Sequence, residues 1–221
     1  MTVVYEDNHI IIVEKTCSEI VQGDKTGDTP LSETVKQYIK EKYDKKGEVF
    51  LGVVHRLDRP VSGLVMFART SKALTRLNKM FRDGEVHKTY HALTRNCPPK
   101  EEDELVHWLV RNEKLNKSFA YDMEVPNAKK AILHYKIIGK TDNYTLLEID
   151  LKTGRHHQIR CQLAKIGCPI KGDLKYGAKR SNPDGGISLQ SYAMDFVHPV
   201  SKTPLHIHST VNLDNLTSYI T

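Results

Sequence analysis

Short apolar runs separated by polar turns recur along the chain, and they predict more strands than helices. Residues 3–5 and 9–13 are two such runs, joined by a polar turn at Asp7-Asn8. Residues 49–54 and 63–68 are apolar and rich in β-branched side chains, which is typical of buried strands. Later strands are expected at residues 90–93, 131–138, 144–151, 189–196 and 205–208.

Three segments instead repeat their apolar positions at helical spacing. The first should begin at Thr29-Pro30, with proline at the first helical position. The second should be capped by Ser71 and end near Asp83-Gly84, and the third should cover residues 156–166 and end at Gly167. The apolar positions are Leu31, Val35, Ile39 and Tyr43 in the first helix, Leu74, Leu77 and Phe81 in the second, and Ile159, Leu163 and Ile166 in the third.

This order of elements predicts an α+β fold built on a mixed, mostly antiparallel sheet with flanking helices. Residues 96–104 are rich in proline and charge, and residues 105–130 give no assignable pattern. We therefore expect a boundary near 96–130 that divides the chain into two tightly joined halves. Together the halves should form a single domain over residues 1–221, with no separate module before residue 1.

Composition and charge narrow the class of protein. The chain has 221 residues, of which 39% are hydrophobic, and 33 Lys and Arg against 27 Asp and Glu give a net charge of +6. This excess suits a partner that carries phosphates but does not by itself establish one. The four cysteines form no CxxC pair, and no apolar run reaches the roughly 20 residues that a spanning helix needs. We expect a cytoplasmic, non-membrane protein with reduced thiols and no metal site.

The segment between the two buried runs carries a dense set of charged groups. Residues 55–62 read HRLDRPVS, and Pro60 argues against a helix there. Because the flanking strands fix both ends of this loop, Asp58 should be held in a defined place, as catalysis requires. The plainer alternative is a solvated turn with an incidental ion pair.

A second cluster, TGRHHQIR, occupies residues 153–160. Arg155 and Arg160 are five residues apart at the start of the third helix, so they point in different directions. One could therefore meet phosphate while the other reaches a carboxylate, although a basic helix end facing water is the alternative. His156 and His157 are adjacent and lack the i, i+4 spacing of a metal-binding pair, so no metal is expected here.

The third cluster is His87-Lys88-Thr89-Tyr90. In a strand, Lys88 and Tyr90 share one face. A tyrosine is a good stacking partner for an unpaired base, although a core tyrosine with a bonded hydroxyl is the commoner case.

In this order and spacing, the motifs resemble the RluA-type RNA pseudouridine synthases, and the resemblance covers nearly the whole chain. His156 stands where threonine is more usual, and residues 189–191 are Leu-Gln-Ser where Leu-His-Ala is common; neither departure touches the matched catalytic residues. The matching motifs are VYED at 4–7, HRLD at 55–58, SGL at 62–64, Lys88 and Tyr90, TGR at 153–155, HQIR at 157–160, GD at 172–173, YG at 176–177 and HP at 198–199.

The resemblance implies a pseudouridine synthase catalytic domain with a central RNA-binding cleft, acting on ribosomal or transfer RNA as a monomer without cofactor or metal. Asp58 corresponds to the essential carboxylate, Arg160 to the arginine that pairs with it, and Tyr90 to the tyrosine that packs on the target base. Expected RNA contacts are His55, Arg56, Arg59, Lys88, Arg155, His157 and Gln158, with phosphate binding by Lys72, Arg76, Lys79 and Arg82.

Several alternatives remain open at this point. The carboxylate can attack C1′ of the ribose or remove a proton at C2′. The chain can also be a catalytically silent RNA-binding or ribosome-assembly protein with the same fold. A hydrolase with a triad of His55, Asp58 and Ser62 is disfavoured, because these residues lie within one short loop and no G-x-S-x-G turn is present.

Overall fold

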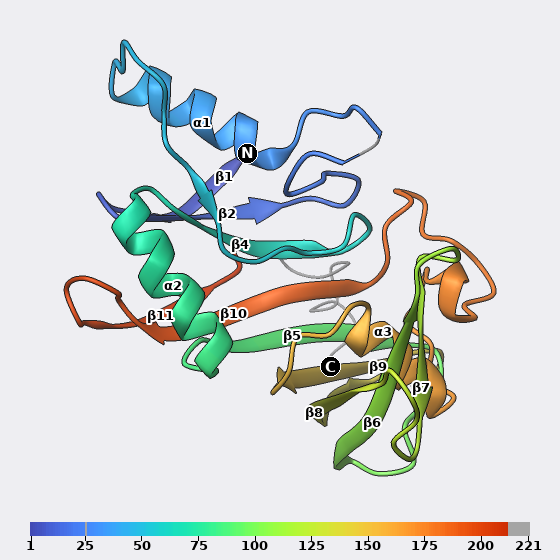
Figure 1. Cartoon of the computed structure of the whole chain (residues 1–221). Coiled ribbons are helices and arrows are strands. Elements are labelled where there is room, and N and C mark those ends of the chain that lie inside the picture. Colours follow the sequence, from blue (N-terminus) through green and yellow to red (C-terminus); the bar gives the residue numbers. More distant parts are fainter. Residues whose placement is uncertain (25, 212–221) are drawn as a thin grey trace. The chain divides into compact units, whose positions relative to one another are not determined.

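The computed structural model describes residues 1–24 and 26–211, which divide into two compact units (Figure 1). The first unit comprises residues 1–86 and 191–211, and the second comprises residues 87–190. The stretch 96–130, where a boundary was predicted, lies inside the second unit because its strands at 102–112 and 117–121 pair with each other and the first also pairs with the strand at 129–140. Among the described residues, no helix is both long and apolar enough to cross a membrane.

The first unit opens with two antiparallel strands joined by a short turn, as predicted. The turn between the first two strands is fixed by Asp7, whose Oδ1 accepts the backbone N–H groups of His9 (2.7 Å) and Ile10 (2.8 Å). The strands lie in the order β1 (Thr2–Glu6), β2 (Ile10–Lys15), β4 (Ser62–Ala68) and β10 (Leu189–Val197), with β3 (Gly52–Val53) beside β4 and β11 (Pro204–His208) beside β10.

The strand predicted at residues 49–54 is much shorter than expected. Only Gly52 and Val53 pair with β4, and Phe50 is 47% exposed. A strand has two edges, and β2 takes one edge of β4 along its full length. Because β3 and β10 must share the other edge, an apolar sequence alone could not extend β3 further.

Two helices cover the strands of this unit. α2 (Ser71–Asp83) packs its buried residues against one face of β2 and β4, and side chains that alternate along these strands point to the opposite face. Figure 1 shows α1 (Leu31–Lys42) on that opposite side. The cluster under α2 includes Ala73, Leu77 and Met80 with Ile10, Ile12, Leu64 and Met66.

The N-terminal ends of α1 and α2 each differ from the prediction by one residue. Pro30 is the N-cap of α1 rather than its first helical residue, and Thr70 rather than Ser71 caps α2. The Thr70 hydroxyl accepts the Ala73 N–H at 3.1 Å, which satisfies one of the free N–H groups of the first turn. Gly84 ends α2 in the left-handed conformation at φ 76°, as the pattern predicted.

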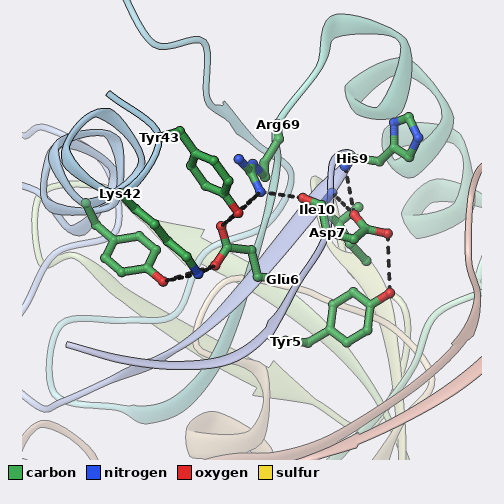
Figure 2. A network of polar contacts seen from close by, with 9 residues as sticks. Tyr5, Glu6, Asp7, His9, Ile10, Lys42, Tyr43 and Arg69 are labelled. Atoms are coloured by element: carbon green, nitrogen blue, oxygen red, sulfur yellow. Dashed lines mark hydrogen bonds and ion pairs between the residues drawn. The ribbon is translucent and has the colours of Figure 1, made fainter. Parts of the chain in front are cut away.

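A buried carboxylate fastens α1 to the strands (Figure 2). The Glu6 side chain is 8% exposed and accepts four contacts, from Arg69 (2.9 Å) and Tyr43 (2.8 Å) on Oε1 and from Lys42 (2.6 Å) and Tyr38 (3.0 Å) on Oε2. Burial raises the pKa of Glu6, but these donors outweigh it and leave the pKa below its ordinary value. Glu6 therefore stays ionised and ties the end of β1 to α1 and to the residue after β4.

The second unit is an antiparallel layer covered on one face. Its strands lie in the order β5 (His87–Thr94), β9 (Thr145–Leu151), β8 (Lys129–Lys140), β6 (Glu102–Asn112) and β7 (Lys117–Tyr121), each antiparallel to the next. The helix α3 (Gln158–Lys165) and the short 3-10 helix η1 (Leu174–Tyr176) pack against β6 and β8. Strands with flanking helices confirm the predicted α+β class.

Candidate active site

A buried lysine, Lys15, binds the backbone of the loop that carries Asp58. Lys15 ends β2 and is 1% exposed, and its ammonium donates to the carbonyls of Val61 (2.6 Å), Arg59 (3.0 Å) and Thr16 (3.0 Å). Burial lowers the pKa of Lys15 to about 8, although the nearby Asp58 charge acts in the opposite direction. Lys15 therefore fixes the backbone on the C-terminal side of Asp58. Lys15 was not among the predicted site residues, and its position at the end of the strand IIIVEK, directly after the apolar run 10–13 and Glu14, was the usable signal.

Asp58 itself is half-buried within a turn. Its carbonyl accepts the Val61 N–H at 3.0 Å, so the chain reverses immediately after it. The next residue, Arg59, turns outward to Asp28, with Nη2 2.6 Å from the carboxylate, and to Thr26 at 2.9 Å. The two arginines beside Asp58 thus differ: Arg56 is exposed, whereas Arg59 contacts the preceding loop of the same unit.

His55 has a structural partner that bears on the hydrolase alternative. Its Nε2 accepts the backbone N–H of Met66 at 2.9 Å, and its ring stacks on Phe81 with centroids 4.9 Å apart. In a neutral imidazole only one nitrogen has a lone pair, and here that lone pair is engaged by Met66. His55 therefore cannot act as the general base for Ser62, and the triad is excluded.

The Ser62-Gly63 motif has a packing reason. Gly63 has φ 108°, and a Cβ at this position would lie 2.3 Å from the carbonyl oxygen of Ser191. Only glycine permits this close approach of β4 to β10, which fixes the C-terminal end of the Asp58 loop.

In the second unit, β5 places Lys88 and Tyr90 on one face, as predicted. Tyr90 is 6% exposed and pairs with Ile149 of β9. The Lys88 ammonium lies against Gly154, where a Cβ would be 3.7 Å from Nζ, and burial lowers the pKa of Lys88. The strand thus carries a buried aromatic ring beside a partly desolvated cation.

The TGR motif forms a turn that Gln158 closes. The Gln158 amide oxygen accepts from the Thr153 hydroxyl (2.8 Å) and the Arg155 N–H (3.0 Å), and its nitrogen donates to Ile132 O (3.1 Å). The exposed Arg155 donates from Nε to the Lys130 carbonyl at 3.0 Å. Gln158 therefore positions this turn, and RNA contact by Gln158 or Arg155 stays a prediction.

The third helix begins at Gln158 rather than at residue 156, because the backbone conformation of His157 is not helical. His157 has φ 51°, which ends any helical path before Gln158, and α3 stops at Lys165. The rings of His156 and His157 stack at 3.8 Å, and His157 Nδ1 lies 3.0 Å from the Tyr176 hydroxyl. His157 is 8% exposed, and its predicted contact with RNA also stays a prediction.

Arg160 forms a buried ion pair that sequence reasoning did not assign. Its Nε and Nη2 donate to Asp173 Oδ2 (2.7 Å) and Oδ1 (2.9 Å), and the two side chains are 5% and 1% exposed. Its guanidinium also lies 5.1 Å from the centre of the Tyr176 ring. The motifs at 172–173 and 176–177 thus orient Arg160, whereas the expected pairing of Arg160 with Asp58 stays a prediction.

The predicted catalytic residues divide between the units, with Asp58 in the first and Tyr90 and Arg160 in the second. Of the predicted phosphate-binding residues of α2, Lys79 pairs with Asp83 at 2.5 Å and Arg76 donates to the Pro199 carbonyl at 2.9 Å. Within residues 1–24 and 26–211, no group of three or more His, Cys, Asp or Glu side chains could hold a metal ion.

Comparison with known proteins gives a consistent result. Residues 9–165 match the family model described as RNA pseudouridylate synthase. The chain is 31% identical over 90% of its length to an uncharacterized RNA pseudouridine synthase of Aquifex aeolicus, and 33% identical over 81% of its length to the ribosomal large subunit pseudouridine synthase C of Rickettsia bellii. These alignments cover 66% and 58% of the two relatives, so the chain spans only part of their length.

Solved structures show the same fold. Human RNA pseudouridylate synthase domain containing 4 superposes with a TM-score of 0.80 at 20% identity, covering 99% of this chain and 90% of that one. Human RNA pseudouridylate synthase domain containing 1 gives 0.71 at 18% identity, covering 98% and 93%. Because the family model matches most of the chain, the protein belongs to the RNA pseudouridylate synthase family.

Proposed function

We propose that this chain isomerises uridine to pseudouridine in ribosomal or transfer RNA, with Asp58 as the catalytic carboxylate. The observation that carries the proposal is the fixed position of Asp58, on a turn whose carbonyls are bound by the buried ammonium of Lys15. Positioning of this kind lowers the barrier of a reaction at a bound substrate. Relatives named for ribosomal large-subunit modification support ribosomal RNA as the first substrate to test.

The reaction is balanced without any consumed reagent. The N1–C1′ bond of uridine breaks, the uracil turns, and a new bond forms between C5 and C1′. The proton on C5 is lost and N1 gains one, so the product is an isomer of the substrate. Asp58 acts either as the nucleophile at C1′ or as the base at C2′. The target nucleotide must first leave the stack, which costs a few kcal/mol.

Tyr90 and Arg160 supply the rest of the proposed site. The Tyr90 ring packs on the uracil while it turns, and Arg160 keeps Asp58 ionised and oriented. A guanidinium has five N–H donors, so the two bonds to Asp173 do not exhaust it. Asp173 and Tyr176 fix the direction of the guanidinium. They are positioning residues, because they act through Arg160.

Cations outside this set would hold the RNA backbone. Arg56 and Arg155 are exposed, and Lys88 is partly buried beside Tyr90. Together with His55, Arg59, His157 and Gln158, they complete the proposed RNA-contacting set. Of these seven, Arg56 and Arg155 are exposed arginines that can bind phosphate through their charge, so their loss should weaken affinity more at low salt than at high salt.

The decisive experiment maps pseudouridine in unmodified large-subunit ribosomal RNA and transfer RNA transcripts after incubation with purified protein. Wild type should modify one or more uridines, and Asp58→Asn should modify none while still binding RNA. The matched control is Asp142→Asn, an exposed aspartate in a turn of the second unit, which should retain full activity. If wild type binds RNA but modifies no uridine, the chain is a silent RNA-binding protein and the proposal is wrong.

Two substitutions separate the roles within the site. Tyr90→Phe should keep most of the activity if the ring is what matters, whereas Tyr90→Ala should lose it. Arg160→Lys keeps a charge but not the planar pair with Asp173, so it should lower kcat and change its pH profile. An unchanged pH profile would contradict the role given to Arg160.

A further inference from the structure

The second unit presents two different faces. On one face, α3 lies against the strands, where the Gln162 amide donates to the carbonyls of Leu105 (3.1 Å) and Ala131 (3.3 Å). Because side chains alternate along a strand, the residues between those buried positions point to the opposite face. That opposite face carries Trp108 on β6 and Phe119 and Tyr121 on β7.

These three aromatic residues, which we call the aromatic platform, occupy neighbouring strand positions. Trp108 is directly opposite Tyr121, and Phe119 is two residues from Tyr121 on the same strand, about 7 Å away. Phe119 is 38% exposed, Tyr121 is 41% exposed, and Trp108 is half-buried. Three neighbouring aromatic side chains on an open sheet face are a stacking surface of the kind that RNA-binding sheets use.

The strand positions around the platform are basic or apolar. Lys130 pairs directly opposite Trp108, with its Nζ 5.9 Å from the ring centre, and the Nζ of Lys117 is 5.7 Å from the ring centre of Phe119. The other strand neighbours on this face are Val106, Val110 and Ile132, and none of these flanking positions carries a carboxylate.

We propose that the aromatic platform binds a single-stranded segment of the substrate RNA, outside the target uridine. Bases stack on the three rings, and the phosphates between them meet Lys117 and Lys130. The inference rests on the proposed function, because it assumes an RNA substrate. It adds a second binding surface on the face of the unit opposite α3, Arg160 and Tyr90.

The two lysines favour RNA over a protein partner. The centres of protein interfaces are depleted of lysine, whereas a groove for single-stranded RNA combines aromatic rings with positive charge. A lysine ammonium interacts with an exposed ring more weakly than a stacked base does. A base that stacks on the ring would therefore displace the ammonium, which can then pair with the neighbouring phosphate.

Lys117 also connects the platform with the other face. Its Nζ lies 5.0 Å from the ring centre of Tyr176, which in turn contacts the Arg160 guanidinium. Lys117 thus stands at the β7 edge between Tyr176 and Phe119. A strand of RNA that crosses this edge between the Tyr176 side and the platform would therefore meet the Lys117 ammonium.

The test uses the only tryptophan of the chain as its probe, because Trp108 belongs to the platform. Titrating the full chain with a ten-nucleotide oligouridine should quench Trp108 fluorescence and give a Kd. Removing a stacked ring weakens such binding by roughly 5- to 150-fold, so Phe119→Ala and Tyr121→Ala should each raise the Kd by that factor. Lys117→Gln with Lys130→Gln should lower the slope of log Kd against log salt by about 1.4.

Two controls make the outcome decisive. Leu115→Ala removes an apolar side chain of the same hairpin that is 58% exposed, and it should leave the Kd unchanged. Phe119→Leu with Tyr121→Leu keeps apolar area but no ring, so it should bind as weakly as the alanine variants. Normal affinity for the oligouridine in the leucine variant would show that the rings are not needed and would overturn stacking. Absence of quenching at saturating RNA would also overturn the inference.

Turnover separates this inference from the proposed function. If wild type forms pseudouridine and the platform variants raise KM without changing kcat, both stand. If wild type forms pseudouridine and the variants keep a wild-type KM and Kd, the platform is refuted while the function holds. If no pseudouridine forms but the variants still weaken oligouridine binding, the platform stands and the enzymatic proposal is wrong.

Discussion

Asp173→Asn should destabilise the protein strongly, because it leaves a buried guanidinium without its counter-charge. Both members of the Arg160–Asp173 pair are nearly inaccessible, and two hydrogen bonds of 2.7 and 2.9 Å join them. Removing one partner of a buried pair costs about 3–5 kcal/mol. Domains have a free energy of unfolding of only about 5–15 kcal/mol. The urea concentration at the unfolding midpoint should therefore fall by a large fraction of its wild-type value.

The control is an exposed pair of similar length in the same unit. Asp122 lies 2.8 Å from Lys165 but is 72% exposed and therefore screened by solvent, so Asp122→Asn should leave the free energy of unfolding nearly unchanged. A double variant, Arg160→Met with Asp173→Leu, should recover much of the lost stability because it removes both charges together. If Asp173→Asn costs no more than Asp122→Asn, the buried pair does not have the role given to it here.

Two other buried charges give predictions about pH. Burial lowers the pKa of Lys15 from 10.5 to about 8. Between pH 8 and pH 10.5 the unfolded chain therefore holds a proton on Lys15 that the folded protein has released. The free energy of unfolding should rise with pH across this window by up to about 3 kcal/mol. Urea unfolding at pH 7.5 and pH 10.5 measures this rise, and Lys15→Met should abolish it. An equal rise in the variant would show that another group causes it. Glu6 has a lowered pKa, so its stabilisation is present above pH 4.5 and is lost as the pH falls through the folded value. Glu6→Gln should therefore lower the free energy of unfolding by about 2–3 kcal/mol at pH 7, with a smaller difference at pH 3, and equal stability at pH 7 would contradict the network of Figure 2.

Most elements followed from local patterns, and the errors have tertiary causes. The strands within residues 2–15, 129–151 and 189–208 were predicted because turn residues separate runs with clear alternation or apolarity. The strand at 49–54 was overextended because its length depends on which neighbour takes the edge of β4. Residues 105–130 resisted assignment because β6 and β7 have one buried and one half-exposed face, which mixes polar and apolar residues.

Chain order and the two-residue period of a strand were enough to locate the candidate catalytic loop and to place Lys88 and Tyr90 on one face. The distant groups that support these residues became visible only in the folded chain. Lys15 lies under the Asp58 turn, Arg160 binds Asp173, and His198 Nε2 lies 2.8 Å from Asp7 Oδ2. Other elements separate these partners along the chain. The local periodicity of a helix or strand does not show which buried charged groups will pair in the folded protein.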